Sequence, residues 1–168
     1  MNICWWNGQS RQDLTHSLPP QAFEAGCNYI RRDRDVRLVC AYDDAVIPRI
    51  QEETGVQYFT IPERASLPMW KSIPDPLLRD TNSGLIAIRV LQHINRDPVY
   101  VIGCDWGLNS KSLYEAEYGS TGTRKYTNGM RRVLSIFSQT SPIIFVNDTA
   151  PDVDQPVISK IQFLSKIL

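Results

Sequence analysis

The feature that most constrains the fold is a helical pattern followed closely by a strand that is apolar on both faces. Residues 81–95 open with Thr-Asn-Ser-Gly, in which the first three residues are good helix N-caps, and continue with apolar residues at helical spacing. Residues 99–104 read VYVIGC, a near-continuous apolar run typical of parallel strands covered on both faces. This succession predicts an α/β fold with a parallel sheet.

The rest of the chain repeats the alternation of strand and helix. We expect a short helix over 45–54, capped by Asp43 or Asp44, a long proline-rich loop over 62–80, and a helix near 127–139. An amphipathic helix is expected over about 156–168. Further strands are expected at residues 2–6, 37–42, 56–61 and 143–147.

The predicted architecture is one Rossmann-like domain over residues 1–168, with a mostly parallel sheet and helices on both faces. Basic and acidic residues both number 18, so no net field draws the chain to nucleic acid as an obligate partner. No stretch approaches the roughly 20 apolar residues that span a bilayer, and the start lacks the pattern of a signal peptide. We therefore expect a cytoplasmic protein without a membrane partner, whose C-terminal helix could pair with a second subunit.

The four cysteines lie far apart, without CxxC or paired histidines at metal spacing. No metal site or disulfide framework is predicted. Each cysteine lies in an apolar or strand-like run, which favours the role of a small buried hydrophobe. A catalytic role for Cys104 is the alternative.

Three polar clusters follow or adjoin predicted strand ends, and ligands of open parallel sheets bind beyond the carboxyl ends of the strands. A glycine among small polar residues lets backbone N–H groups approach an anion, and a helix start favours phosphate. A carboxylate at a strand end can accept from a ribose hydroxyl or act as a general base. The candidate residues are Asn7, Gly8, Gln9 and Ser10; Asn82, Ser83 and Gly84; and Asp105, Trp106 and Gly107, with Asp43 on the same edge and Tyr114 in the following loop.

Each cluster also has a structural explanation. Residues 7–10 could be an ordinary turn from a strand into a loop, and residues 81–84 could cap a helix without binding anything. Gly84 argues for a site, because a glycine in the first turn costs helix stability that capping does not require. Asp105 could accept hydrogen bonds from loop N–H groups instead of serving as a base.

The motifs NGQS, TNSGLIAIRVLQHI, YVIGCDWG and LYEAEY, in this order, resemble the small Rossmann-like glycosyltransferases related to sialyltransferases. They are also similar to uncharacterised phage-encoded relatives. The similarity covers roughly residues 2–147, and about four short motifs carry it. It implies that Asn7, Gly8 and Ser10 face a nucleotide-sugar donor, that Asn82, Ser83 and Gly84 contact its phosphate or ribose, and that Asp105 lies on the sugar side.

That family takes its catalytic base from a late histidine, whereas no histidine follows His93 in this chain. One hypothesis is therefore a transferase that uses Asp105 as base and a nucleotide sugar as co-substrate, with no other cofactor. The other is a non-catalytic nucleotide-binding protein of the same fold, with a sequestering or accessory role. If the chain is phage-encoded, either protein would act in the host cytoplasm.

Overall fold

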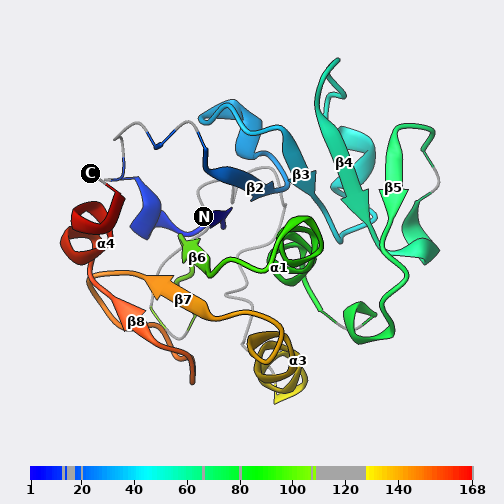
Figure 1. Cartoon of the computed structure of the whole chain (residues 1–168). Helices are drawn as coiled ribbons and strands as arrows, with labels where there is room; N and C mark the ends of the chain where they lie inside the picture. The colour runs from blue at the N-terminus through cyan, green and yellow to red at the C-terminus, as the bar shows by residue number, and fades with distance from the viewer. Residues whose placement is uncertain are drawn as a thin grey trace.

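The computed structural model contains one eight-stranded sheet in which every pair of neighbouring strands is parallel. It describes residues 1–12, 14, 18–19, 21–65, 67–79, 81–106, 108 and 128–167. The predicted α/β, Rossmann-like fold is confirmed (Figure 1). The strands are β1 Asn2–Trp5, β2 Phe23–Cys27, β3 Leu38–Cys40, β4 Gln57–Thr60, β5 Trp70–Ser72, β6 Val99–Ile102, β7 Ile143–Val146 and β8 Val157–Ile158; the helices are α1 Ser83–Ile94, α3 Asn128–Ser138 and α4 Lys160–Ile167.

The strand order is β5-β4-β3-β2-β1-β6-β7-β8. The chain builds the sheet outward from β1 to β5, then returns to place β6 on the other side of β1 and continues outward to β8. The direction of winding therefore reverses between β1 and β6. Such a reversal is the topological switch point, where open α/β sheets bind their ligands.

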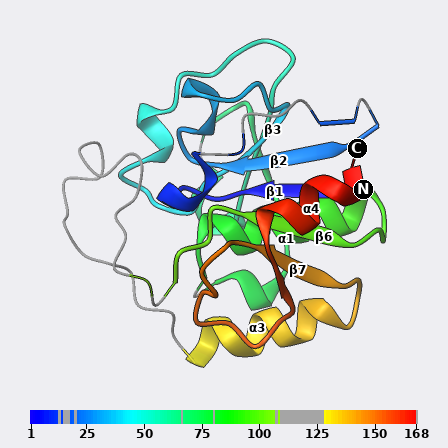
Figure 2. The same cartoon turned by 90° about the vertical axis from the view of Figure 1, so that its left-hand side faces the viewer.

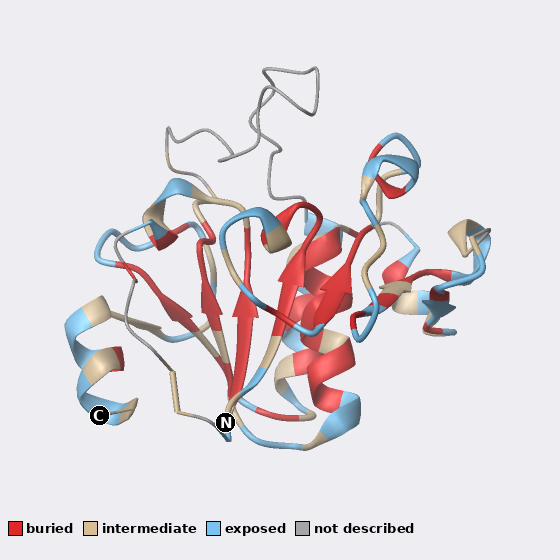
Figure 3. Cartoon of the chain, turned by 90° about the horizontal axis from the view of Figure 1, so that it is seen from above, coloured by how far each residue is buried: buried red, intermediate tan, exposed pale blue. Residues whose placement is uncertain are grey.

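Side chains of successive strand residues point to opposite faces of the sheet, and the core accordingly has two main parts. Cys4 packs in one part with residues of α1 and α3, whereas its neighbours Ile3 and Trp5 pack in the other with Phe163 of α4. Figures 1 and 2 show α1 and α3 on one side of the sheet and α4 on the other. Most strand residues and most of α1 are buried, as Figure 3 shows in red.

Helix α1 begins where the caps predict. The side chain of Asn82 accepts a hydrogen bond from the backbone N–H of Leu85, which satisfies a donor that has no helical partner. Nine of its residues are buried, since the helix packs across the central strands. The predicted helix near 127–139 is present as α3.

Four expectations differ from the structure. The segment 45–54 is not an α-helix: only Ile47–Arg49 form a 3-10 turn, with Pro48 at its start, and Ile50 is already extended. The region 62–80 is not one loop, because it contains β5, which tolerates prolines nearby at the edge of the sheet. Strand β2 was not expected. The tail begins with β8, so its helix is limited to Lys160–Ile167.

Helix α4 keeps Phe163 buried while Ile161 is 79 % exposed. The pairing of this helix with a second subunit stays a prediction. Within the described parts of the chain, no helix is long and apolar enough to cross a membrane.

Candidate functional site

The turn after β1 lies directly against the end of β6. The N–H of Trp6 donates to the carbonyl of Ile102 at 2.7 Å, and the N–H of Gly8 donates to the carbonyl of Gly103 at 2.8 Å. A Cβ atom on Gly8 would lie 2.4 Å from that carbonyl oxygen and 2.5 Å from Oδ2 of Asp105. The two backbones can approach this closely only because residue 8 is glycine.

The carboxylate of Asp105 ties together the ends of three adjacent strands. Oδ2 accepts from the backbone N–H of Ser10 at 3.1 Å, and Oδ1 accepts from the side-chain amide of Asn147 at 3.2 Å. Asn147 follows β7 and also donates to the carbonyl of Cys104. These bonds favour the structural explanation of Asp105. The residue is nevertheless half-buried rather than enclosed, and it lies at the switch point.

The start of α1 is integrated into the core. Ser83 is 4 % exposed, and its hydroxyl accepts from the N–H of Tyr42 at 3.0 Å and donates to Oδ1 of Asn28 at 2.8 Å. It therefore connects α1 to the segments that follow β3 and β2. Its single donor hydrogen is used by Asn28, so a phosphate oxygen could accept from this hydroxyl only by displacing that partner.

Gly84 has a packing reason that the sequence did not reveal. A Cβ atom at this position would lie 2.1 Å from Cε2 of the Trp6 ring, so the indole rests directly on the helix backbone. This contact accounts for a glycine in the first turn without an anion. The inference from Gly84 to a phosphate site therefore loses its basis, and a valine there would displace Trp6 whether or not a ligand binds.

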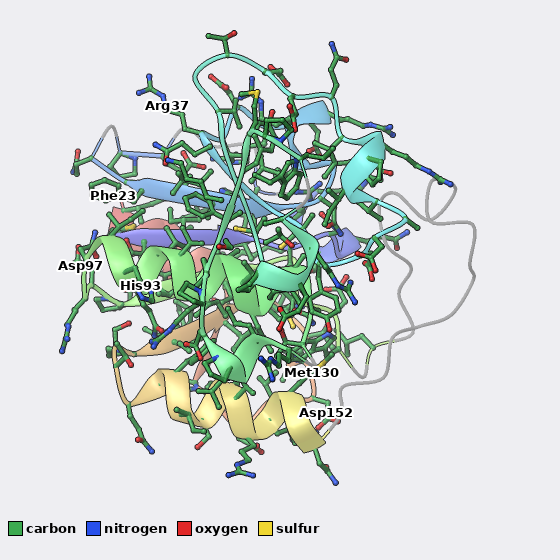
Figure 4. The ribbon with its side chains drawn as sticks, turned by 90° about the vertical axis from the view of Figure 1, so that its right-hand side faces the viewer. Phe23, Arg37, His93, Asp97, Met130 and Asp152 are labelled. Carbon is green, nitrogen blue, oxygen red and sulfur yellow. The ribbon has the colours of Figure 1, made fainter. Side chains whose placement is uncertain are left out.

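An aromatic pair lies at the same edge. The rings of Trp6 and Trp106 meet edge to face at 4.6 Å, and Trp106 is only half-buried. Its carbonyl accepts from the N–H of Asp152 at 2.7 Å, which holds the segment after β7 against it. In Figure 4, Asp152 and Met130 lie at this end of the molecule, whereas Phe23, His93 and Asp97 lie at the other end.

The remaining candidates divide into described and undescribed residues. Gln9 is exposed and presents its amide at the edge, whereas Asn7 is half-buried and its Oδ1 is buried. Asp43 follows β3, and its carbonyl begins the turn that includes Ile47. The predicted site residues Gly107 and Tyr114 lie outside the described residues.

All four cysteines are buried free thiols in the part of the core that α1 covers. Burial raises the pKa of each thiol, and the pKa of Cys27 rises to about 12. Thiolates are the reactive form, so these pKa values indicate inert side chains. This favours the prediction of small buried hydrophobes over a catalytic Cys104.

Several residues of this edge were not among the candidates, notably Asn28, Tyr42 and Asn147. Asn28 has a positive φ of 52°, which is uncommon for a residue other than glycine, and it directly follows β2. The available signal was its position after a strand, but the strand itself was not expected. Tyr42 and Asn147 each closed a predicted strand and could have been included on that ground.

Within the described part of the chain, no three His, Cys, Asp or Glu side chains are placed to hold a metal ion. Comparisons with protein-family models, with curated proteins and with solved structures find no match. The site must therefore be interpreted from its own geometry.

Proposed function

We propose that this chain binds a nucleotide or a nucleotide sugar at the carboxyl edge of its sheet, between the ends of β1 and β6. The observation that carries the proposal is the switch point itself. The ends of β1 and β6, whose next strands in the chain lie on opposite sides of the sheet, present half-buried or exposed polar residues, Asn7, Gln9 and Asp105, beside a half-buried Trp106. Ligands of parallel α/β sheets bind at this position.

The chemistry of the edge suits a nucleotide. The indole of Trp106 offers an aromatic surface, and base–aromatic stacking contributes roughly 1–3 kcal/mol. The exposed amide of Gln9 can both donate and accept hydrogen bonds, as recognition of a base or ribose requires. The absence of net charge disfavours a long polyanion, but a single nucleotide needs only a few local contacts. The resemblance of NGQS and TNSG to nucleotide-sugar enzymes supports the same ligand class.

A glycosyltransferase is the second candidate, because Asp105 places a carboxylate at the switch point. As base it would take the proton of an acceptor hydroxyl while the bond between sugar and phosphate breaks and the nucleotide leaves. Each oxygen of this carboxylate already accepts a hydrogen bond within the protein. Binding without transfer is therefore the better supported of the two functions.

The first experiment is a thermal-shift screen with nucleotides and nucleotide sugars. A ligand that binds only the folded state at one hundred times its Kd stabilises it by about 2.7 kcal/mol, which raises the midpoint. Trp106→Ala should weaken binding by roughly tenfold or more if a base stacks there. Phe23→Ala is the matched control, since Phe23 is an exposed aromatic residue at the opposite end (Figure 4). Equal losses in both variants, or no shift with any nucleotide, would refute the proposal.

The second experiment separates binding from transfer. Labelled nucleotide sugars are incubated with the protein and the free nucleotide is measured. A transferase releases nucleotide, and Asp105→Asn reduces that rate by about a hundredfold or more while binding persists. A binding protein returns the donor intact, and in that case the substitution changes no rate.

A further inference from the structure

The guanidinium of Arg64 is held in place at the carboxyl edge of the sheet, beyond the end of β4. Arg64 ends a short 3-10 turn, Pro62–Arg64, that follows β4. Its carbon Cζ lies 4.0 Å from the centre of the Tyr42 ring, and Nη1 donates to the carbonyl oxygen of Tyr42. A cation that is already stacked and hydrogen-bonded loses little further conformational freedom when a ligand binds.

The carboxylate that faces this guanidinium is a weak partner. Nε of Arg64 lies 3.5 Å from Oδ1 of Asp44, beyond the usual range of a hydrogen bond, and the Asp44 side chain is 75 % exposed. By contrast, Arg131 has two carboxylates, at 2.6 and 3.2 Å. Among the described residues, no acceptor contacts Nη2 of Arg64. The outer side of this guanidinium can therefore bind an oxyanion in place of Asp44.

The position of Arg64 relates it to the proposed site. The guanidinium lies over the ring of Tyr42, and the backbone N–H of Tyr42 donates to Ser83 at the start of α1, where the helix dipole is positive. Strands β3 and β6 are separated by β2 and β1, three strand spacings or roughly 14 Å. An elongated ligand stacked on Trp106 after β6 would extend over the ends of β1 and β2 toward Arg64.

We infer that Arg64 binds a phosphate group of the ligand and that Asp44 occupies its place when the ligand is absent. This inference deepens the proposed nucleotide binding and depends on it for the identity of the ligand. Arg64 forms charge-assisted hydrogen bonds with the phosphate, and Asp44 competes for the same donors. The two residues therefore have opposite effects on affinity.

The test compares three variants, Arg64→Gln, Asp44→Asn and the control Arg96→Gln. Arg96 is exposed and lies between α1 and β6, at the opposite edge of the sheet. Its substitution changes the net charge by the same amount as Arg64→Gln. Binding of the ribonucleoside 5′-monophosphates, their parent nucleosides and pyrophosphate is measured by calorimetry. Arg64→Gln should weaken monophosphate binding by about tenfold or more and leave nucleoside binding unchanged. Asp44→Asn should tighten it by about two- to fivefold, because Asp44 no longer competes for the guanidinium and an exposed ion pair is weak.

Asp44→Asn keeps the contact between Arg64 and Tyr42, so it tests the inference even if Arg64→Gln folds poorly. If monophosphates bind the wild type and both variants equally, Arg64 is structural and the inference fails while nucleotide binding stands. If pyrophosphate binds in an Arg64-dependent way but no nucleoside or nucleotide adds affinity, the oxyanion site stands and the proposed function fails. If none of these probes binds, both are overturned.

Discussion

Replacing Gly84 with alanine tests the contact between Trp6 and the start of α1. The new methyl group would lie 2.1 Å from Cε2 and 2.4 Å from Cζ2 of a ring that is almost fully buried. Such overpacking typically costs 1–3 kcal/mol, against a gain of roughly 0.5–1 kcal/mol in helix propensity. Trp6 has little room to move, since its Nε1 donates to Sγ of Cys4 at 3.2 Å and its ring also meets Phe145. We expect Gly84→Ala to lower the free energy of unfolding by about 1–2 kcal/mol.

The assay is urea unfolding in two backgrounds, wild type and Trp6→Leu. Leucine remains apolar but lacks the indole atoms that face Gly84, so the alanine should then be neutral or stabilising by up to about 1 kcal/mol. The sign of the effect should thus reverse between the backgrounds. The reasoning is refuted if Gly84→Ala stabilises the wild type, or if it destabilises both backgrounds equally.

Three further predictions follow from the site. Ser83→Ala should lower the free energy of unfolding by about 1–3 kcal/mol in urea titrations, because the buried Oδ1 of Asn28 loses its donor and the part-buried N–H of Tyr42 loses its acceptor; an unchanged midpoint would contradict this. Asp105→Ala should lower the free energy of unfolding by about 1.5–3 kcal/mol in the same assay, since the N–H of Ser10 loses its carboxylate acceptor. A decrease of less than about 0.5 kcal/mol would show that this hydrogen bond contributes little to stability. The pKa of Cys27 rises from 9.0 to about 12, so between these pH values the unfolded chain binds fewer protons than the folded chain. The free energy of unfolding should therefore fall with rising pH, by up to about 1.4 kcal/mol per pH unit for this thiol. Cys27→Ala should remove that part of the pH dependence in unfolding curves at about pH 8.5–10, and an unchanged pH dependence would contradict the assignment.

The sequence was most informative where structure is determined locally. The caps and apolar spacing of α1 and the apolar run of β6 are properties of neighbouring residues, and both elements lie where they were predicted. Strand β2 is not evident from its sequence, FEAGC, because it has no β-branched residue and includes Glu, Ala and Gly, which are depleted in strands. Its strand form depends on β1 and β3 on either side. Glu24, for example, accepts hydrogen bonds from Trp5 on β1 and from Arg34.

The candidate site shows the same division. The placement of Asn7 and Asp105 at strand ends followed from the strand pattern, and the structure brings their segments into contact. The bonds of Ser83 to Asn28 and Tyr42 could not be predicted, because they join segments distant in sequence. The packing reason for Gly84 could not be predicted either, because the ring that occupies its missing side-chain space belongs to Trp6, which follows β1 and is distant in sequence.

The strand order also has a consequence for how the chain acquires its fold. Strand β1 pairs with β2, which is close in sequence, but its other neighbour is β6. The pairing of Asn2 with Val99 therefore forms only after β6 has been synthesised. Until β6 is synthesised, a sheet of β1 to β5 would leave β1 as an open edge, and unpaired edges are templates for aggregation. Long-range parallel pairing is also intrinsically slow. The junction that forms the candidate site therefore cannot close until β6 has been synthesised, and a chain interrupted before β6 would leave the hydrogen-bonding edge of β1 unpaired.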